Sequence, residues 1–508
     1  MFAKISSMGF WGLSAFPVSV ETDITPGLPG FDIVGLPDAA VKESRDRVRA
    51  ALKNCGYSFP IHRITVNLAP ADRKKSGPLY DLPILLGILS ASGQLTASLS
   101  GAAFLGELSL GGDIRPVDGI LPMVLAAKES GINTVFLPKE NELEGGVVEK
   151  VKVYGVSHIN ELINFLEGKN LLKPAHSQLP DSAEEVFSPD FADVKGQQSG
   201  RRAMEIAAAG GHNLLLIGPP GSGKSMLAKR LPSILPDMSF EEMIETSKIY
   251  SVAGLLSQRS PLITVRPFRA PHHTISAIGL AGGGSTPHPG EVSLAHNGVL
   301  FLDELPEFSR QSLEVLRQPI EDQEITISRI GGSFTYPCSV TIVAAMNPCP
   351  CGYYGHPTRN CICKEAQVSR YLSKISGPLL DRLDLHVDAM PVEYEHLASG
   401  KAAESSVEIK KRVQKARMLQ RERLEKFGVY SNARIPSGKL HECCPMTDGA
   451  SAFLKTAFEH LGLSARAYDR VVKVARTIAD LDGSDKIDTA HIAEAVQYRS
   501  LDRKYWQK

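Results

Sequence analysis

The sequence contains no run of about 18 consecutive apolar residues, which is the length that a membrane-spanning helix requires. Its apolar stretches, such as 214–217, are short and are followed by glycine or proline. An excess of charge is also missing, because 56 Lys and Arg residues balance 56 Asp and Glu residues. The sequence therefore predicts no membrane insertion. A polyanionic partner would have to bind a local basic patch and not the surface as a whole.

Cysteine is scarce, with eight residues in a chain of 508, and this excludes a disulfide-rich scaffold. The first 20 residues lack the apolar core of a secretion signal, since Gly9, Gly12 and Pro17 interrupt them. We expect this segment to belong to the folded protein, as a β-strand. Together these features predict a protein of a reducing compartment, the cytoplasm.

The length and the 43% of apolar residues predict several domains, each with its own core. Residues 1–170 alternate short β-type runs with helical patterns and predict an α/β domain. Residues 171–185 are rich in Pro, Ser and acidic residues and predict a linker. Strand-like and helix-like segments alternate again over 186–395, which indicates an α/β core with a parallel sheet, and helical periodicity fills 396–508.

A glycine-rich loop follows the strand predicted at 213–217 and precedes a helix that begins near Met226. Its glycines allow backbone N–H groups to surround phosphate oxygens, Lys224 adds a positive charge, and the Ser225 hydroxyl can bind Mg²⁺. The helix N-terminus adds its dipole. The sequence therefore predicts a nucleoside-triphosphate site, formed by Gly218, Pro219, Pro220, Gly221, Ser222, Gly223, Lys224 and Ser225.

Two further predicted strands end in polar residues. The strand at 298–302 leads to Asp303, which can hold Mg²⁺, and to Glu304, which can orient and deprotonate the attacking water. The strand at 341–345 leads to Asn347, whose amide would meet the γ-phosphate. Taken alone, the two acids could cap a helix and the asparagine could belong to a turn. Combined with the phosphate-binding loop, they predict a site of nucleotide hydrolysis.

These motifs, together with SGPLLDRLDLHVD at 376–388, resemble the AAA+ ATPases of the magnesium-chelatase and MCM-helicase branch. FRAPHHTISAIGLAGGG at 268–284 and EVSLAHNGVLFLDELPEF at 291–308 are similar to the YifB/ComM subfamily, and the resemblance covers essentially the whole chain. It implies an AAA+ core with a C-terminal helical lid, ATP and Mg²⁺ as ligands, and a ring, expected to be hexameric, whose active sites lie between subunits.

The resemblance also implies roles for three arginines. Arg382, in LLDRLD, matches an arginine finger that reaches the nucleotide of the neighbouring subunit, and Arg466, in LSARAYDR, matches the sensor-2 position, with Arg470 as the nearby alternative. Positive charge on the equatorial oxygens of the transferred phosphoryl group favours its transfer. Composition alone would favour solvated helix-face or ion-paired arginines over these roles.

Two segments could contact DNA. Residues 324–337 predict a β-hairpin with Arg329 near its tip, where the helicase relatives have a hairpin that binds DNA phosphates. Residues 401–426 hold nine Lys or Arg against four Glu, a net charge of +5, with Lys410, Lys411 and Arg412 in sequence. The alternatives are an edge hairpin with a solvated arginine and an ordinary solvated helix face. No base-reading motif is present, so any recognition would be of backbone or branched shape.

Four cysteines gather in the Cys-rich segment 349–363, as two C-x-C pairs separated by nine residues. Two such pairs can surround a tetrahedral Zn²⁺, although the usual spacing is C-x₂-C. His356 is a substitute ligand, and four reduced thiols in a surface loop are the alternative. The candidate ligands are Cys349, Cys351, Cys361 and Cys363.

The N-terminal domain resembles the proteolytic domain of Lon proteases, through residues 26–52 and 105–132. Those proteases use a serine nucleophile that a lysine activates. Here the matching positions hold Leu79 and Leu121. We therefore expect this domain to act in assembly or partner binding and not as a peptidase.

The sequence as a whole predicts a ring-forming, Mg²⁺-dependent AAA+ ATPase. The resemblance to ComM implies a DNA translocase or branch-migration helicase of recombination or natural transformation, acting on single-stranded or branched DNA. A magnesium-chelatase-like or protein-remodelling ATPase is the alternative, and an ATP-dependent peptidase is the least favoured of the three.

Overall fold

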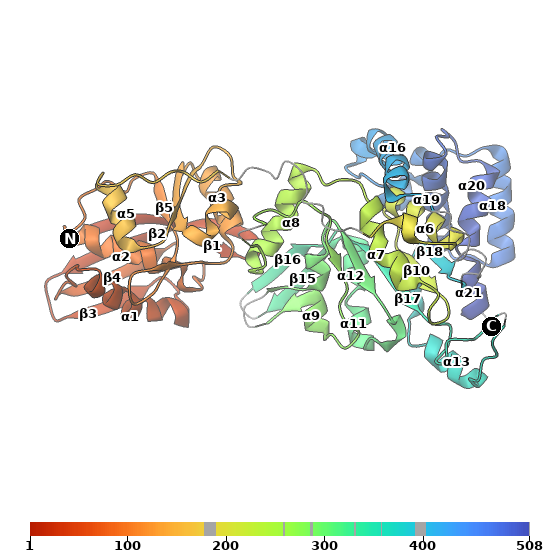
Figure 1. Ribbon diagram of the computed structural model, residues 1–508, viewed down its shortest axis with the longest axis horizontal. Helices are drawn as coiled ribbons and strands as arrows, with labels where there is room; N and C mark the ends of the chain where they lie inside the picture. Colours follow the sequence, from red (N-terminus) through yellow and green to blue (C-terminus); the bar gives the residue numbers. More distant parts are fainter. Residues whose placement is uncertain are drawn as a thin grey trace. The chain divides into compact units, whose positions relative to one another are not determined.

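The chain folds into two compact units, which Figure 1 shows in colours that follow the sequence. The computed structural model describes residues 1–176, 189–257, 260–284, 288–329, 332–356, 358–391 and 403–506. Unit 1 consists of Met1–Ser182 and Phe240–Ile263, and unit 2 consists of Ala183–Ser239 and Thr264–Lys508. Residues 177–185 of the predicted linker lie outside the described residues.

Unit 1 is built on a seven-stranded sheet in the order β3-β4-β2-β1-β5-β8-β9. β1 and β2 form a long antiparallel pair, β2 pairs antiparallel with β4, and the other neighbours are parallel. Side chains alternate along β4, where Ile64, Val66 and Leu68 are buried, as a sheet with one covered face requires. The strands are β1 (Phe2–Trp11), β2 (Ser14–Thr25), β3 (Gly30–Val34), β4 (Arg63–Ala69), β5 (Ala102–Phe104), β8 (Thr134–Pro138) and β9 (Lys152–Val156), with a separate ribbon of β6 (Glu107–Leu108) and β7 (Ile114–Arg115).

Most helices of unit 1 lie against this sheet, and α8 packs on α3. α2 is buried along nearly its whole length and packs on β1 and β2, as does α3. An apolar helix of this kind is stable only inside a core. The helices are α1 (Ala39–Asn54), α2 (Asp81–Ala91), α3 (Ile120–Glu129), α4 (Glu142–Gly145), α5 (Ile159–Leu166) and α8 (Phe240–Val252).

Helix α8 comes from the segment between the two predicted ATP-site motifs, yet it belongs to unit 1. The Gly119 N–H donates to the Ser251 carbonyl oxygen at 3.0 Å, and the Ser251 hydroxyl donates to Glu144 at 2.6 Å. The sequence pattern assigns all of 186–395 to the ATPase core, and the structure differs in this helix. Hydrophobic periodicity predicts a helix, but it does not predict against which core the apolar face of that helix packs.

Unit 2 contains a five-stranded parallel sheet in the order β11-β14-β17-β10-β18. The strand that precedes the glycine-rich loop, β10, lies between β17 and β18, and Figure 1 shows these three strands side by side. Buried apolar runs fill β10, β14 and β17, as expected for a parallel sheet covered on both faces. The strands are β10 (Leu214–Ile217), β11 (Phe268–Arg269), β14 (Val299–Leu302), β17 (Thr341–Met346) and β18 (Leu385–Asp388).

Helices and two small ribbons surround the sheet of unit 2. β15 and β16 form the predicted hairpin, paired from Glu324↔Pro337 to Arg329↔Gly332, and the residues at its tip, 330–331, lie outside the described residues. The elements are α6 (Gln198–Gly210), α7 (Lys224–Ile234), α9 (Ala277–Ala281), β12 (Gly282–Gly283), β13 (His288–Pro289), α10 (Glu291–Leu294), α11 (Arg310–Glu314), α12 (Arg317–Asp322), β15 (Glu324–Arg329), β16 (Gly332–Pro337), α13 (Glu365–Leu372) and α14 (Gly377–Leu380).

The C-terminal helices share one hydrophobic core with the parallel sheet. His212, which precedes β10, is hydrogen-bonded to Thr477 at 2.7 Å. The helical region predicted at 396–508 is therefore packed onto the parallel sheet as part of unit 2. None of the helices in the described part of the chain is long and apolar enough to cross a bilayer. The helices are α16 (Ser406–Leu424), α17 (Leu440–Cys443), α18 (Asp448–Leu461), α19 (Ala465–Leu481), α20 (Thr489–Gln497) and α21 (Ser500–Tyr505).

Candidate ATP site

The candidate site lies at one edge of the unit 2 sheet. β10, β14 and β17 are parallel, and β17 pairs with both of the others. The carboxyl ends of parallel strands meet at the same edge, and ligands bind there in open α/β sheets. The glycine-rich loop, the Asp303–Glu304 pair and Asn347 follow these three strands. The topology therefore brings together groups that are 78 and 123 residues apart in the chain, Ser225 with Asp303 and Lys224 with Asn347.

The glycine-rich loop turns directly into helix α7, which begins at Lys224. Gly221 and Gly223 have φ angles of 76° and 86°, which side chains with a Cβ rarely adopt. The Lys224 ammonium donates to the carbonyl oxygens of Gly218 at 2.8 Å and Pro219 at 2.9 Å. Burial lowers the pKa of Lys224, and the nearby Asp303 carboxylate opposes this change. The loop thus places a partly buried cation beside the N-terminus of a helix, where phosphate groups bind favourably.

The three strand ends are connected by hydrogen bonds. The Ser225 hydroxyl donates to the Asp303 carboxylate at 2.7 Å, and the Lys224 ammonium donates to the Asn347 amide oxygen at 3.2 Å. A hydroxyl and a carboxylate are oxygen ligands of the kind that Mg²⁺ prefers. The donor set of this site therefore fits a magnesium–nucleotide complex, with Ser225 and Asp303 on the metal and Lys224 and Asn347 on the phosphates.

Glu304 stands apart from these bonds and remains open to solvent. Its side chain is 58% exposed, and its φ angle of 53° is uncommon for a residue other than glycine. The imidazole Nδ1 of His273 lies 3.2 Å from the Glu304 carboxylate. Strained backbone at a polar strand end is frequent at functional sites. Glu304 can therefore accept a proton from a water molecule at this edge, with His273 holding its carboxylate.

The contact between His273 and Glu304 was not predicted, because in the sequence the His272–His273 pair is typical of a loop. His273 also lies edge-on to Phe308, with ring centroids 6.5 Å apart, and near the ring of His272 at 4.1 Å. The available signal was the position of the pair, shortly after the edge strand β11 of the same sheet. Strand neighbours follow from tertiary topology, so the sequence alone could not pair His273 with Glu304.

The three predicted arginines lie in different surroundings. Arg382 is paired with Glu321 at 2.6 Å, and its side chain is 10% exposed. Arg466 is exposed in the first turn of α19. Arg470 is ion-paired with the buried Asp384. Burial opposes ionisation of Asp384, but Arg470 outweighs it and holds the pKa of this carboxyl well below its usual range. Of the two sensor-2 candidates, Arg466 is therefore the one that its surroundings leave exposed.

Most of the basic segment 401–426 lies in α16, and several of its charges are paired within the chain. Arg329, the other predicted DNA contact, ends β15 beside the tip of the hairpin. The lysines and arginine singled out on α16 each contact a carboxylate, so they do not form the unpaired basic stripe that the count of +5 suggested. The pairs are Lys410 with Asp237 at 2.5 Å, Lys411 with Glu408 at 2.8 Å, and Arg412 with Glu205 at 2.6 Å.

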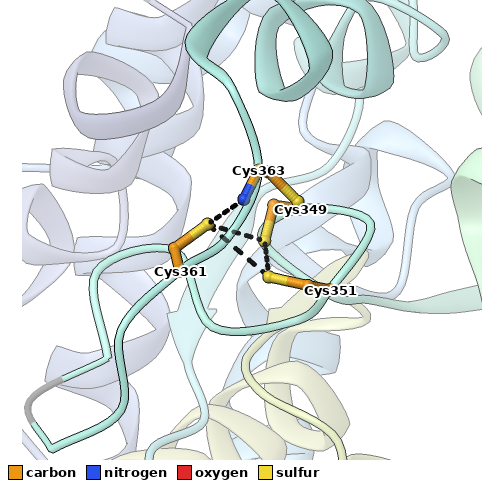
Figure 2. A group of neighbouring side chains, drawn as sticks. All are labelled: Cys349, Cys351, Cys361 and Cys363. Atoms are coloured by element: carbon orange, nitrogen blue, oxygen red, sulfur yellow. Dashed lines mark hydrogen bonds between the residues drawn. The ribbon is translucent and has the colours of Figure 1, made fainter.

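The four cysteines of the segment 349–363 converge, and we call them the tetracysteine cluster: Cys349, Cys351, Cys361 and Cys363. Figure 2 shows their sulfur atoms turned toward one another. Burial raises the pKa of Cys349. Burial would also raise that of Cys351, but the N–H groups of Tyr353 and Ile362 donate to its sulfur, and its pKa falls to about 6. The substitute ligand His356 accepts the N–H of Arg359 at 3.1 Å and is not part of the cluster.

The positions that match the Lon nucleophile and its lysine are apolar and filled. Leu79 and Leu121 are buried in unit 1. The Leu121 N–H donates to Glu144 at 2.9 Å and to the Ser251 hydroxyl at 3.3 Å. Burial raises the pKa of Glu144, although the donors around it oppose this change. Residues of α4 and α8 thus accept the backbone N–H of Leu121, and these hydrogen bonds are structural.

The parallel sheet, the phosphate-binding loop and the acidic strand end define unit 2 as a P-loop ATPase domain of the AAA+ class. Three family descriptions match the chain. "Magnesium chelatase, subunit ChlI" matches residues 190–397, "Subunit ChlI of Mg-chelatase" matches residues 20–141, and "Magnesium chelatase, subunit ChlI C-terminal" matches residues 403–499.

Full-length relatives are similar to the whole chain. YifB of Salmonella typhimurium is 46% identical over 97% of this chain and 96% of its own length. Competence protein ComM of Haemophilus influenzae is 44% identical over 99% of this chain and 98% of its own length. Lon protease of Heliobacterium modesticaldum is 27% identical over 33% of this chain and 22% of its own length. The chain belongs to the magnesium-chelatase-like AAA+ family of YifB and ComM, and it shares partial similarity with Lon proteases.

Proposed function

We propose that this protein is a Mg²⁺-dependent ATPase whose chemistry takes place at the edge formed by β10, β14 and β17. The observation that carries this proposal is the pair of hydrogen bonds that join Ser225 to Asp303 at 2.7 Å and Lys224 to Asn347 at 3.2 Å. Mg²⁺, when bound, neutralises charge on the β- and γ-phosphates. Lys224 binds the same phosphates, Asn347 orients the γ-phosphate, and Glu304 removes a proton from the attacking water.

The proposal includes assembly into a ring, for which a hexamer is the expected form. In such a ring Arg382 would act on the nucleotide of the next subunit, and Arg466 would act as sensor 2. Within one chain Arg382 is held by Glu321, whose side chain is 49% exposed. Ring formation would therefore have to replace this ion pair with a phosphate contact, so that hydrolysis depends on assembly.

We further propose that the substrate of the motor is DNA, single-stranded or branched. Two observations support this. A relative that matches 99% of this chain is named a competence protein, and the hairpin of β15 and β16 carries Arg329 beside its tip. Contacts of this kind bind phosphates without reading bases. The eight cysteines are all free, which is compatible with work in the reducing cytoplasm.

The decisive experiment measures phosphate release by the full chain with no DNA, with single-stranded DNA, with duplex DNA and with a four-way junction, and follows strand exchange in parallel. We expect ATP turnover that rises with single-stranded or junction DNA, and binding that weakens steeply as salt increases. Arg329→Ala should lower the slope of log affinity against log salt by about 1. Turnover without any DNA binding at low salt would overturn the DNA part and leave the ATPase.

The alternative is a magnesium-chelatase-like or protein-remodelling ATPase. One observation favours it, which is that all three matching family descriptions name a chelatase subunit. This alternative predicts ATP turnover that DNA does not change and that a partner protein stimulates. The same four-way comparison of DNA substrates therefore separates the two functions.

A further inference from the structure

The tetracysteine cluster is compact enough to surround a single metal ion. Its sulfur atoms all lie within 4.8 Å of one another. Cys349 and Cys351 are 3.3 Å apart, Cys349 and Cys361 are 3.6 Å apart, and Cys351 and Cys361 are 3.5 Å apart, measured between sulfurs. These pairs are joined by dashed lines in Figure 2. A zinc–sulfur distance of about 2.3 Å gives a tetrahedron with sulfur–sulfur edges of about 3.8 Å, close to the observed spacing.

Other occupants fit this spacing less well. A disulfide requires sulfurs about 2.05 Å apart, and all eight cysteines are free. An iron–sulfur cluster places several irons and bridging sulfides between its thiolates, so it needs a wider set of ligands than this one. Hard cations such as Mg²⁺ prefer oxygen ligands. Four thiolates that can surround one ion tetrahedrally are the ligand set of a structural zinc site. Such a site leaves no coordination position for water.

The backbone around the cluster supports the same conclusion. The Cys363 N–H donates to the sulfur of Cys361 at 3.4 Å. The Gly352 N–H donates to the Cys349 carbonyl oxygen at 3.0 Å and closes a turn around the first C-x-C pair. N–H donors offset part of the negative charge that four thiolates bring to one ion, and such outer contacts orient metal ligands.

The cluster lies next to the candidate ATP site in the chain and in space. Cys349 lies two positions after Asn347 in the chain. Asn347 is the residue that accepts a hydrogen bond from the Lys224 ammonium. A Cβ placed on Gly352, whose φ is 85°, would be 2.4 Å from the ring of Pro220 in the phosphate-binding loop. Both loops also line one small cavity, to which Gly218 and Tyr354 contribute. The cysteine loop is therefore in direct contact with the phosphate-binding loop.

We propose that the tetracysteine cluster binds one structural Zn²⁺, and that this ion holds the loop after Asn347 beside the phosphate-binding loop. Metal binding fixes the segment 349–363, whose described residues form no helix or strand of their own. The ion takes no part in phosphate chemistry, because its four ligands are cysteines. Its effect on the ATP site is to keep Asn347 and Pro220 in place, and this second part rests on the proposed ATPase function.

The first test measures the metal content of the full-length chain purified without chelator. We expect about one Zn²⁺ per chain and no visible absorption, and about one Co²⁺ with strong visible bands after exchange. Cys361→Ser and Cys363→Ser should each lose most of the metal. Cys55→Ser is the matched control, because Cys55 is equally half-buried but lies in unit 1, and it should keep the metal.

A second measurement does not depend on whether the variants fold. A thiol reagent should modify four fewer cysteines in the untreated wild-type protein than after removal of the metal with a chelator, and added Zn²⁺ should restore the protection. Equal thiol counts before and after chelation would overturn the site. An iron content with visible absorption in the untreated protein would also overturn it, in favour of an iron centre.

The coupling to the ATP site is tested by nucleotide binding. Removal of Zn²⁺ should weaken binding of a fluorescent ATP analogue about tenfold, equal to about 1.4 kcal/mol, and added Zn²⁺ should reverse the loss. Unchanged nucleotide affinity in a protein that binds zinc would overturn the coupling alone. If the wild-type chain bound zinc but did not hydrolyse ATP, the proposed ATPase function would fail while the metal site stood.

Discussion

Unit 1 and unit 2 are both α/β folds built around one large sheet, and they use polar side chains in opposite ways. In unit 1 the polar groups near Leu121 are buried and bonded to each other, with Glu144 accepting from Ser251 at 2.6 Å and from the Leu121 N–H at 2.9 Å. In unit 2 polar groups gather at an open sheet edge, where Glu304 is 58% exposed. A fold only determines where side chains lie, and the residue types at those places determine whether a reaction can occur there.

Glu144 in unit 1 and Glu304 in unit 2 show this difference most directly. Glu144 is satisfied by three donors inside unit 1, which makes it part of the packing between α3, α4 and α8. Glu304 is contacted by His273 at 3.2 Å, and its backbone lies in the left-handed region. Exposure and strain are tolerated where a residue has to meet a ligand. We therefore expect substitutions of Glu144 to change stability and substitutions of Glu304 to change turnover.

The largest expected effect follows from Glu304→Gln. This variant keeps the size of the side chain and removes the proton acceptor, so turnover should fall by about 10²–10⁴-fold, measured as steady-state phosphate release. Glu307→Gln is the control, because Glu307 lies three residues further on and is ion-paired with Lys374 at 3.4 Å. Its turnover should stay close to that of the wild type. Equal turnover of the Glu304 variant and the wild type would contradict the proposed role.

A smaller effect is expected from His273→Ala, which removes the imidazole that lies 3.2 Å from Glu304. We expect kcat to fall about tenfold with little change in KM for ATP, because His273 positions the base and does not bind phosphate. His273→Asn, whose amide can still donate to the carboxylate, should recover part of the loss. A fall in nucleotide affinity with an unchanged kcat would exclude the positioning role. His272→Ala supplies the comparison with the neighbouring ring.

The effect on stability comes from Glu144→Gln and depends on pH. Burial raises the folded-state pKa of Glu144, so the stability linked to this group is fully present below its unfolded pKa of about 4.3 and is lost as pH rises through the folded value. The glutamine variant cannot ionise and should escape this loss. Each tenfold change in the acid dissociation constant on folding corresponds to about 1.4 kcal/mol of stability. Thermal unfolding between pH 4 and 8 measures the difference.

The stability difference between the Glu144 variant and the wild type should therefore move in favour of the variant as pH rises. Glu149→Gln is the control, because Glu149 is exposed in the same unit. The opposite sign holds for Asp384 in unit 2, whose lowered pKa gives stability that is lost on acidification. Parallel curves for the Glu144 variant and the wild type would show that this carboxyl has no linked effect.

The smallest effect is expected on helix α16. Lys411 is paired with Glu408 at 2.8 Å on the helix surface, and exposed pairs of this kind contribute about 0–1 kcal/mol. Lys411→Ala should change DNA affinity by less than about twofold, measured by fluorescence anisotropy at several salt concentrations. A drop comparable to that of Arg329→Ala would show that α16 binds DNA in spite of its ion pairs.

The local motifs were predictable from the sequence because short segments determine them. The glycine-rich loop lies between β10 and α7, and the hairpin strands, Glu324–Arg329 and Gly332–Pro337, fill the predicted range. Strand, turn and loop chemistry depends on neighbours in the chain. For the same reason the two C-x-C pairs could be recognised as candidate ligands before their geometry was known.

Contacts between distant segments were not predictable. A count of charges gave +5 for the region of α16, but the count does not show that Lys410 faces Asp237 or that Arg412 faces Glu205. The position of α8 in unit 1 and the contact between His273 and Glu304 are of the same kind. Each contact depends on which surfaces meet after folding, and local sequence patterns do not predict which surfaces meet.

The sequence by itself identified the family, the candidate ATP-site residues and the four candidate metal ligands, because those features consist of residue types at fixed short spacings. The tertiary structure decided how they are used. It placed Ser225 beside Asp303 and Lys224 beside Asn347 through the order of parallel strands. It also brought the loop that carries the tetracysteine cluster into contact with the phosphate-binding loop, at Gly352 and Pro220. Spacing along a chain specifies chemistry, whereas proximity across a sheet edge depends on how the whole chain packs.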